Sequence, residues 1–177
     1  KNVIEPLFGK YHHVIRHDRQ NSRGGGLLAL IPKNMKFREM KQFRKNGNFE
    51  SFGIEIRIKN KNLVVLLGYR KPGSKCQTVL REIMKDLLDL KQNFIWFGDF
   101  NMPNINWESN KLEEQGIESE LLLNFCISNG FSQLVKAPTR GNNILDLCIV
   151  SNSSMANDCI LKVGAPVFES DHNALSL

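Results

Sequence analysis

The stretch from residue 63 to residue 97 constrains the fold most, because two apolar runs flank one amphipathic helical pattern. The runs are LVVLLGY, residues 63–69, and FIWF, residues 94–97, and each is typical of a buried β-strand. The segment Gln77–Leu90 carries its apolar residues in two adjacent rows at helical spacing. The rows are Val79, Ile83 and Leu87, and Leu80, Met84 and Leu88. Strand, helix and strand in this order predict a helix that covers one face of a β-sheet.

Further strand patterns outnumber helical ones. FGIEIRI, residues 52–58, alternates apolar and polar side chains, which predicts a half-buried strand. A second helix is predicted at 117–129, with Gly130 in the C′ position, and the basic segment 33–48 predicts a loop or short strand. Other strand candidates are 11–16, LLALI (27–31), FSQLV (131–135), ILDLCIV (144–150) and DCILKV (158–163). These patterns predict an α/β sandwich of two packed sheets with helices outside.

The totals fit one ordinary domain of 177 residues with a core of its own. The sequence has no signal peptide and no apolar run of about 18 residues, which a membrane span needs. Because it starts at Lys1 and stops in HNALSL, we expect a single domain over residues 1–177 that is incomplete at both ends. Four cysteines without a CxxC pair favour buried, reduced thiols over a disulfide or a zinc site, and so an intracellular protein.

Charge is distributed unevenly along the chain. Residues 1–75 hold 17 lysines and arginines against 5 acidic residues, a net charge of +12, and residues 76–177 hold 7 against 13, a net charge of −6, which together give the +6 of the whole chain. A basic half beside an acidic half fits a face that binds a polyanion next to a carboxylate-lined site that holds a cation. A solvated basic surface without a partner is the alternative.

The first polar cluster, Gly98-Asp99-Phe100-Asn101, follows FIWF directly. One interpretation is a turn, since Asp and Asn both favour loops. The other is a functional site, because sites collect at the carboxyl ends of buried strands in α/β sheets. Asp99 would then accept a proton or orient a water, and Asn101 would donate an amide hydrogen to an anionic oxygen.

Two more clusters lie towards the C-terminus. Asp146 interrupts the apolar run ILDLCIV, where a carboxylate is unfavourable without a partner. A capped or bulged strand start would explain it, and so would a carboxylate that orients a histidine. In Ser170-Asp171-His172 the adjacent Asp and His face opposite sides of an extended chain, so one could meet a metal and the other a neighbouring side chain. The alternative is a polar turn before a strand.

In order, GDFN, LDL and SDH, with Tyr69 upstream, resemble the endonuclease/exonuclease/phosphatase superfamily. The finer resemblance is to the apurinic-endonuclease-like domain of LINE-type (non-LTR) retrotransposons, along nearly the whole chain. It is carried by RHDRQNSRGGGLLALIPKN, GYRKPG, GDFNMPNINW, PTRGNNILDLCIVSN and SDHNALSL. The resemblance implies a four-layer α/β sandwich of two mixed β-sheets flanked by helices. It also implies a DNA-nicking phosphodiesterase in the nucleus, on a parent chain that carries a reverse transcriptase.

The resemblance assigns roles to the C-terminal residues first. His172 is similar to the histidine beside the scissile phosphate, which acts as a general base or stabilises the transition state. Asp146 is similar to the carboxylate that orients this histidine. Asp171 is similar to a ligand of the catalytic divalent ion, normally Mg²⁺, with Mn²⁺ possible.

Three upstream positions complete the implied site. Asp99 resembles the acid/base residue near the attacking water or the leaving oxygen. Asn101 resembles the amide that holds the phosphate, and Tyr69 the tyrosine whose hydroxyl touches it. An in-line displacement at an anionic centre needs a hard cation on oxygen ligands, hydrogen-bond donors to the phosphate and a positioned water, and these residue types supply them.

The sequence departs from the family upstream. Family members have a strand ending in asparagine and then a strand with a metal-binding glutamate, and Glu5 lacks the context of that glutamate. We therefore expect catalysis to be impaired in this fragment. Two alternatives stay open: a non-catalytic remnant that binds nucleic acid, and a phosphatase of small phosphorylated molecules.

Some features are assigned to packing or to DNA. His12, His13 and His17 lie on a strand-like segment whose spacing does not gather them on one metal. Gly24–Gly26 lacks the GK[ST] of a phosphate loop and precedes a strand, which indicates a turn. The basic run 33–45 fits DNA phosphates and a solvated loop equally well. Arg140, in the loop after Pro138-Thr139, is the better candidate for a residue that faces DNA.

Overall fold

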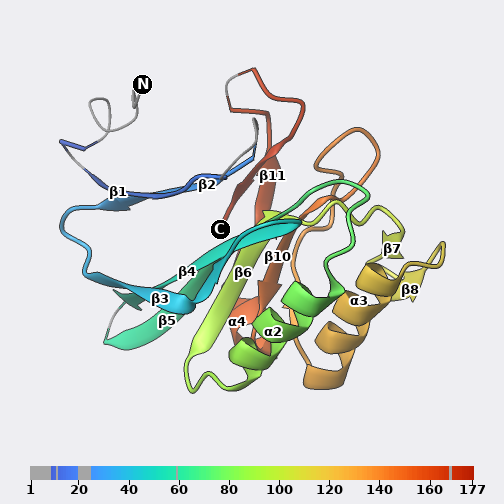
Figure 1. The fold of residues 1–177 in the computed structure, drawn as a ribbon, viewed down its shortest axis with the longest axis horizontal. Coiled ribbons are helices and arrows are strands. Elements are labelled where there is room, and N and C mark those ends of the chain that lie inside the picture. Colours follow the sequence, from blue (N-terminus) through green and yellow to red (C-terminus); the bar gives the residue numbers. More distant parts are fainter. Residues whose placement is uncertain (1–8, 11, 20–24, 59, 168) are drawn as a thin grey trace.

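The computed structural model describes residues 9–10, 12–19, 25–58, 60–167 and 169–177. Its centre is a mixed six-stranded sheet in the order β3-β4-β5-β6-β10-β9 (Figure 1). The strands are β3 (Phe37–Lys45), β4 (Phe49–Ile58), β5 (Lys61–Arg70), β6 (Asn93–Asp99), β10 (Asp146–Val150) and β9 (Ser132–Gln133). β5 and β6 are parallel and the other neighbours antiparallel, as the predicted strand–helix–strand unit requires.

Two helices cover one face of this sheet, α2 (Gln77–Leu88) and α3 (Ile117–Asn129) (Figure 1). α2 buries Leu80, Ile83, Met84 and Leu87 against it, which follows the predicted apolar stripe. α3 has the predicted bounds, and Gly130 ends it with φ 66°, a left-handed conformation that glycine adopts without a steric penalty. The small hairpin β7 (Ile105–Asn106) and β8 (Lys111–Leu112) leads into α3.

Two separate antiparallel hairpins lie on the opposite face. They are β1 (His12–His17) with β2 (Leu27–Pro32), and β11 (Lys162–Gly164) with β12 (Ala174–Ser176). Ile15 and Ile31 of the first hairpin pack on Phe52, Ile54 and Ile56 of β4. The second packs Val163 and Leu175 near Ile95 and Cys148. The predicted architecture of mixed β-sheet layers flanked by helices is therefore confirmed.

Three elements differ from the sequence-based expectations. β3 is a nine-residue strand in which Met40 and Phe43, three positions apart, are both buried, because a register shift between Met40 and Lys45 interrupts the alternation. The helix α4 (Ser153–Asp158) takes up the start of the strand predicted at 158–163, and the Asn152 side chain caps it by accepting from the amide of Met155.

The third difference concerns β5, which is half-buried instead of fully buried. Val64 and Leu66, which face the helices, have no exposed surface, whereas Leu63, Val65 and Leu67 on the hairpin side are partly exposed. The reason is that the two hairpins are not bonded to each other and cover that face incompletely.

Candidate functional site

Four polar side chains form one row across the central sheet, where β5 and β6 reach their carboxyl ends. Glu50 of β4 pairs with Tyr69 of β5, Tyr69 with Asp99 of β6, and Asp99 with Asp146 of β10. Direct cross-strand partners project to the same side of a sheet, so all four face the layer of the two hairpins. Residues separated by up to 96 positions are brought together in this way.

Asp146 contacts His172, which lies just before β12. The His172 Nδ1 is 2.8 Å from Oδ2 of Asp146, and the two side chains are 23% and 19% exposed. Because an ionised carboxylate only accepts, Nδ1 carries the proton and Nε2 is left as the second functional nitrogen of the ring. Asp146 is the first residue of β10 and does not lie inside it, so the strand-start and histidine-orienting interpretations both describe its position.

Asp99 lies directly opposite Asp146, and this neighbour alters its acidity. Burial is the main cause that raises the pKa of Asp99, and the negative charge of Asp146 raises it further. His172 and hydrogen bonds from Asn101 act in the other direction, and the amide of Asn101 donates to Oδ1 of Asp99 over 3.1 Å. A raised pKa favours the protonated form of this carboxyl group, which suits it to proton transfer.

The carboxylates of Asp99 and Asp146 and the imidazole of His172 could hold a cation. One ligand atom from each lies within 4.8 Å of the others. Two facing carboxylates supply the oxygen ligands that hard divalent cations prefer, and a bound cation would offset their repulsion. The donor set therefore fits a divalent metal ion. The other described histidines belong to no such group, and the Nε2 of His17 donates instead to the carbonyl of Lys45 over 2.7 Å.

Asn101 is held by a partner that the sequence reasoning did not identify. It adopts φ 48°, in the left-handed region, and its Nδ2 donates to the carbonyl of Arg70 over 2.9 Å. In return Nη1 of Arg70 donates to the carbonyl of Asn101 over 2.9 Å, and Nη2 donates to that of Ser74 over 2.7 Å. Arg70 is only 8% exposed. One amide hydrogen of Asn101 is thus used to fix the loop.

Asp171, the predicted metal ligand, lies outside the group formed by Asp99, Asp146 and His172. Its carboxylate forms an ion pair with Arg140, at 2.6 Å between Nη2 and Oδ2, and both side chains are largely exposed. The hydrogen bond from Arg140 is the main cause that lowers the pKa of Asp171. Asn173 joins the two segments, because its amide donates to the carbonyl of Thr139 over 2.7 Å.

A pocket of about 370 Å³ lies beside this row of side chains. Tyr69, Asp99 and Asp146 line it on the sheet, and Gly26 of the loop before β2 and Asn173 line it from the hairpin layer. The guanidinium carbon of Arg19 lies 5.5 Å from the centroid of the Tyr69 ring. Tyr69 therefore lies in the same pocket as the two aspartates, as its predicted role requires.

Gly98, immediately before Asp99, has a structural reason to be glycine. A Cβ at this position would lie 2.0 Å from the carbonyl oxygen of Gly68, its partner on the parallel strand β5. The close approach of β5 and β6 thus requires glycine at the strand end that presents Asp99.

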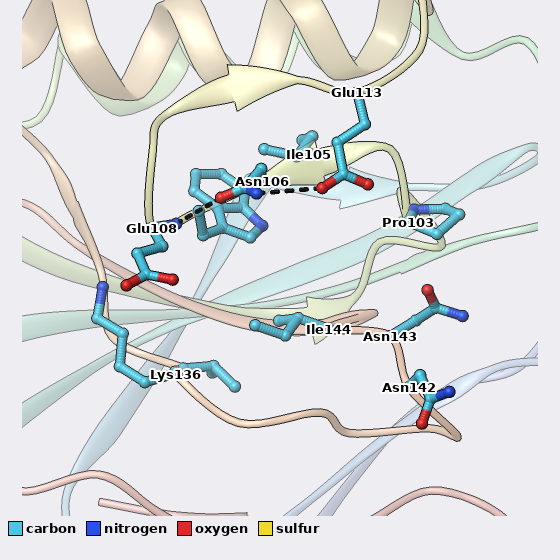
Figure 2. A pocket seen from close by; sticks show the side chains of 11 residues that line it. Pro103, Ile105, Asn106, Glu108, Glu113, Lys136, Asn142, Asn143 and Ile144 are labelled. Carbon is cyan, nitrogen blue, oxygen red and sulfur yellow. Dashed lines mark hydrogen bonds between the residues drawn. The ribbon is translucent and has the colours of Figure 1, made fainter.

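Another pocket, of about 600 Å³, is lined by none of the predicted site residues. It lies between the segment 103–113 and the loop before β10 (Figure 2). Figure 2 shows the Asn106 carboxamide donating to Glu113 over 3.1 Å and accepting from the amide of Glu108 over 3.2 Å. We place the candidate site at the pocket of about 370 Å³, because the facing carboxylates of Asp99 and Asp146 line it and Asp146 contacts His172.

The remaining sequence-based features are more ordinary. Part of the basic run 33–45 lies on β3, where Arg38, Arg44 and Lys45 each form an ion pair with a glutamate. Cys76, Cys126, Cys148 and Cys159 are free thiols, the first three of them buried. Glu5 and Gly24 lie outside the described residues. None of the helices in the described segments has the length and hydropathy needed to cross a membrane.

Residues 63–176 match the model of a family described as endonuclease-reverse transcriptase. The fold is similar to the endonuclease domain of TRAS1, a telomere-specific non-LTR retrotransposon, with a TM-score of 0.72 and 17% identity over 93% of this chain and 78% of that chain. The fold is also similar to D. rerio TDP2 in complex with a single-strand DNA product, with a TM-score of 0.60 and 7% identity over 97% of this chain and 78% of that chain. The human Nocturnin catalytic domain is similar with a TM-score of 0.57 and 13% identity over 99% of this chain and 69% of that chain. No curated protein matches the sequence.

Proposed function

This chain belongs to the endonuclease-reverse transcriptase family, and from this premise we propose that the pocket beside Asp99, Asp146 and His172 is a phosphodiesterase site that nicks DNA at a retrotransposition target. The contact between His172 and Asp146, directly opposite Asp99, carries the proposal. It joins an oriented imidazole to a carboxyl group with a raised pKa, two groups suited to proton transfer at a phosphate.

Each residue has a role in the proposed reaction. Nε2 of His172 faces the phosphate and accepts a proton from the attacking water, while Asp146 holds the ring in the tautomer that leaves Nε2 free to do so. The oxygen of a water attacks phosphorus as the bond from phosphorus to the leaving 3′ oxygen breaks. Asp99 in its protonated form donates a proton to the leaving 3′ oxygen. The hydroxyl of Tyr69 and the side-chain amide of Asn101 donate to the non-bridging oxygens.

We propose a divalent cation, Mg²⁺ or Mn²⁺, as the cofactor. The carboxylates of Asp99 and Asp146 would hold it, and Asp171 would join them when its carboxylate leaves Arg140. When bound, such an ion neutralises phosphate charge and lowers the pKa of a coordinated water. The Arg140–Asp171 ion pair would then compete with metal binding.

DNA is the proposed substrate because of charge. The first 75 residues carry a net charge of +12 and would attract the phosphate backbone, and Arg140, exposed beside the site, is the proposed phosphate contact closest to it. A nick that leaves a 3′ hydroxyl would provide a primer for the reverse transcriptase that we propose for the parent chain. Action on chromosomal targets would take place in the nucleus.

The test is conversion of supercoiled plasmid to nicked circles in Mg²⁺, repeated in Mn²⁺. We expect nicking to depend on the cation and to fall by about 10²–10⁴-fold in His172→Ala and in Asp146→Ala. Lys85→Ala, a change at an exposed lysine of α2 outside the basic first 75 residues, is the matched control and should nick at the original rate. Absence of nicking with either cation, or an unchanged rate in His172→Ala, would contradict the proposal.

A non-catalytic nucleic-acid-binding remnant is the second candidate, and the Arg140–Asp171 ion pair favours it. In that case plasmid stays supercoiled while DNA affinity falls steeply with salt concentration. A phosphatase of small molecules is distinguished by comparing turnover of plasmid with that of a soluble phosphomonoester. A preference for the phosphomonoester would replace the DNA proposal.

A further inference from the structure

Glu50 is a buried carboxylate that the roles above leave unused. It is 1% exposed and lies at the end of the row formed with Tyr69, Asp99 and Asp146. An ionised carboxylate is unfavourable at such a depth unless it has charged or hydrogen-bonding partners. Its partners therefore indicate what the position is for.

Both partners come from the segment between β1 and β2. Arg19 donates through Nε to Oε1 of Glu50, and the amide of Gly26 donates to Oε2 over 2.7 Å. One carboxylate thus ties both sides of this segment to β4. Gly26 lines the pocket next to Tyr69 and Asp99, so Glu50 fixes part of the pocket wall.

Arg19 lies between Tyr69 and a glycine. Its guanidinium carbon is 5.5 Å from the Tyr69 ring centroid, within the range of a cation–π contact. On another side its Nη2 would lie only 2.3 Å from a Cβ at Gly25, a residue with φ +80°. Any side chain at Gly25 would therefore displace the guanidinium. Hydrogen bonding to Glu50 is the main cause that raises the pKa of Arg19, and a hydrogen bond to Tyr69 contributes.

We propose that Glu50 and Arg19 are positioning residues: Glu50 holds Arg19, and Arg19 holds the ring of Tyr69 at the edge of the pocket. This inference rests on the proposed function, in which Tyr69 donates to the phosphate. Glu50 offsets the charge of Arg19, so the pair orients Tyr69 without placing an uncompensated cation beside the carboxylates that would hold a metal. The same contacts give the glycine-rich segment a function, the packing of Arg19.

The chain allows a direct spectroscopic test, because it contains only two tyrosines. In a Tyr11→Phe background, 3-fluorotyrosine labelling leaves a single ¹⁹F resonance, that of Tyr69. Arg19→Met, which keeps the bulk but removes the charge and the fork of donors, should shift and broaden it. Arg57→Met, at an exposed arginine near the far end of β4, is the control and should leave it in place. An unmoved resonance in Arg19→Met would overturn the inference.

Nicking kinetics provide a second test of the positioning role of Arg19. Arg19→Met should lower kcat by about 10-fold with less than a 2-fold change in KM, because it disturbs a donor to the transition state. Arg19→Lys should restore part of the loss. In a Tyr69→Phe background, Arg19→Met should cost little more, since its effect passes through the lost hydroxyl. Fully additive losses would overturn the inference.

A further variant and thermal unfolding distinguish an effect on Tyr69 from a loss of folding. Glu50→Gln keeps the shape and an acceptor for Gly26, so it should move the Tyr69 resonance less than Arg19→Met does, with thermal unfolding confirming that each variant is folded. If Arg19→Met fails to fold, Arg19→Lys and Glu50→Gln carry the ¹⁹F test. An unaltered chain that does not nick DNA contradicts the proposed function, while the ¹⁹F shift still decides whether Arg19 holds Tyr69.

Discussion

Asp99 and Asp146 are direct antiparallel partners on β6 and β10, so two carboxylates project side by side from the same face of one sheet. Like charges in directly opposite positions destabilise a sheet. Burial and the charge of Asp146 raise the pKa of Asp99, so Asp99 keeps its proton more readily and the repulsion is smaller. His172 also donates a hydrogen bond to Asp146. An arrangement that lowers stability and perturbs acidity in a pocket is typical of a functional site.

Asp99→Asn should therefore stabilise the fold while abolishing nicking. The stability gain should be about 0.5 kcal/mol, the scale of a cross-strand charge pair. Since the pKa of Asp99 is raised above its ordinary 3.8, the folded state keeps a proton that the unfolded state releases, and the original chain loses stability as pH rises through that interval. Urea unfolding at a series of pH values should show this loss in the original chain and not in Asp99→Asn. A variant less stable than the original at neutral pH would contradict the argument.

Gly98→Ala should separate β5 from β6. The added methyl would lie 2.0 Å from the carbonyl of Gly68, which the parallel pairing holds in place. We expect a loss of about 3 kcal/mol or more in the free energy of unfolding, the range of severe steric changes in a core. Gly164→Ala on β11 is the control, because a Cβ there meets nothing within 4 Å. Equal denaturation midpoints for the two variants would show that the strands separate easily.

Arg70→Lys should loosen Asn101. The lysine keeps the charge but cannot donate to the carbonyls of Asn101 and Ser74 together, as the guanidinium does. The loss of a hydrogen bond from a buried charged group predicts a cost of about 2 kcal/mol in stability. The proposed role of Asn101 predicts a fall in kcat as well. Chemical denaturation and nicking rates measure the two effects, with Arg57→Lys as the exposed control.

Arg140→Ala should separate DNA binding from metal binding. Removing one phosphate contact should make the slope of log affinity against log salt shallower by about 1. It also frees the Asp171 carboxylate, so half-maximal nicking should need less Mg²⁺. Fluorescence anisotropy of a labelled duplex and a Mg²⁺ titration of nicking give these quantities. Arg81→Ala on α2 is the control, and a slope equal to that of the control would remove Arg140 from the interface.

Much of the fold could be predicted from local patterns. The helical period of the apolar residues predicted the helix α2 at Gln77–Leu88, because periodicity is set by which face of an element is covered, and the continuous apolar run FIWF predicted the buried strand before Asp99. The pattern of apolar residues did not predict the element where a bulge or a helix cap changed the local structure. The bulge in β3 hid a nine-residue strand, and the helix that Asn152 caps was not predicted and ends at the first residue of the strand predicted at 158–163.

Some residues of the candidate site could likewise be predicted from the sequence, and others could not. Motif residues such as Asp99 and His172 could be selected because a charged or polar residue beside apolar runs is unusual and because their order resembles a known family. Glu50 and Arg70 could not be selected, since neither differs in the sequence from a surface residue. Their burial depends on partners 24 to 31 positions away, which no local pattern specifies.

The sequence by itself determined the elements, the faces they bury and the chemical types at the ends of their strands. Only the tertiary structure decided that Glu50, Tyr69, Asp99 and Asp146 share one row, that His172 contacts Asp146, and that Asp171 pairs with Arg140. The physical reason is the distance along the chain over which the interactions act. Helical and strand periodicity arise between near neighbours in the chain, whereas strand register and the pairing of buried charges are set by packing between distant segments.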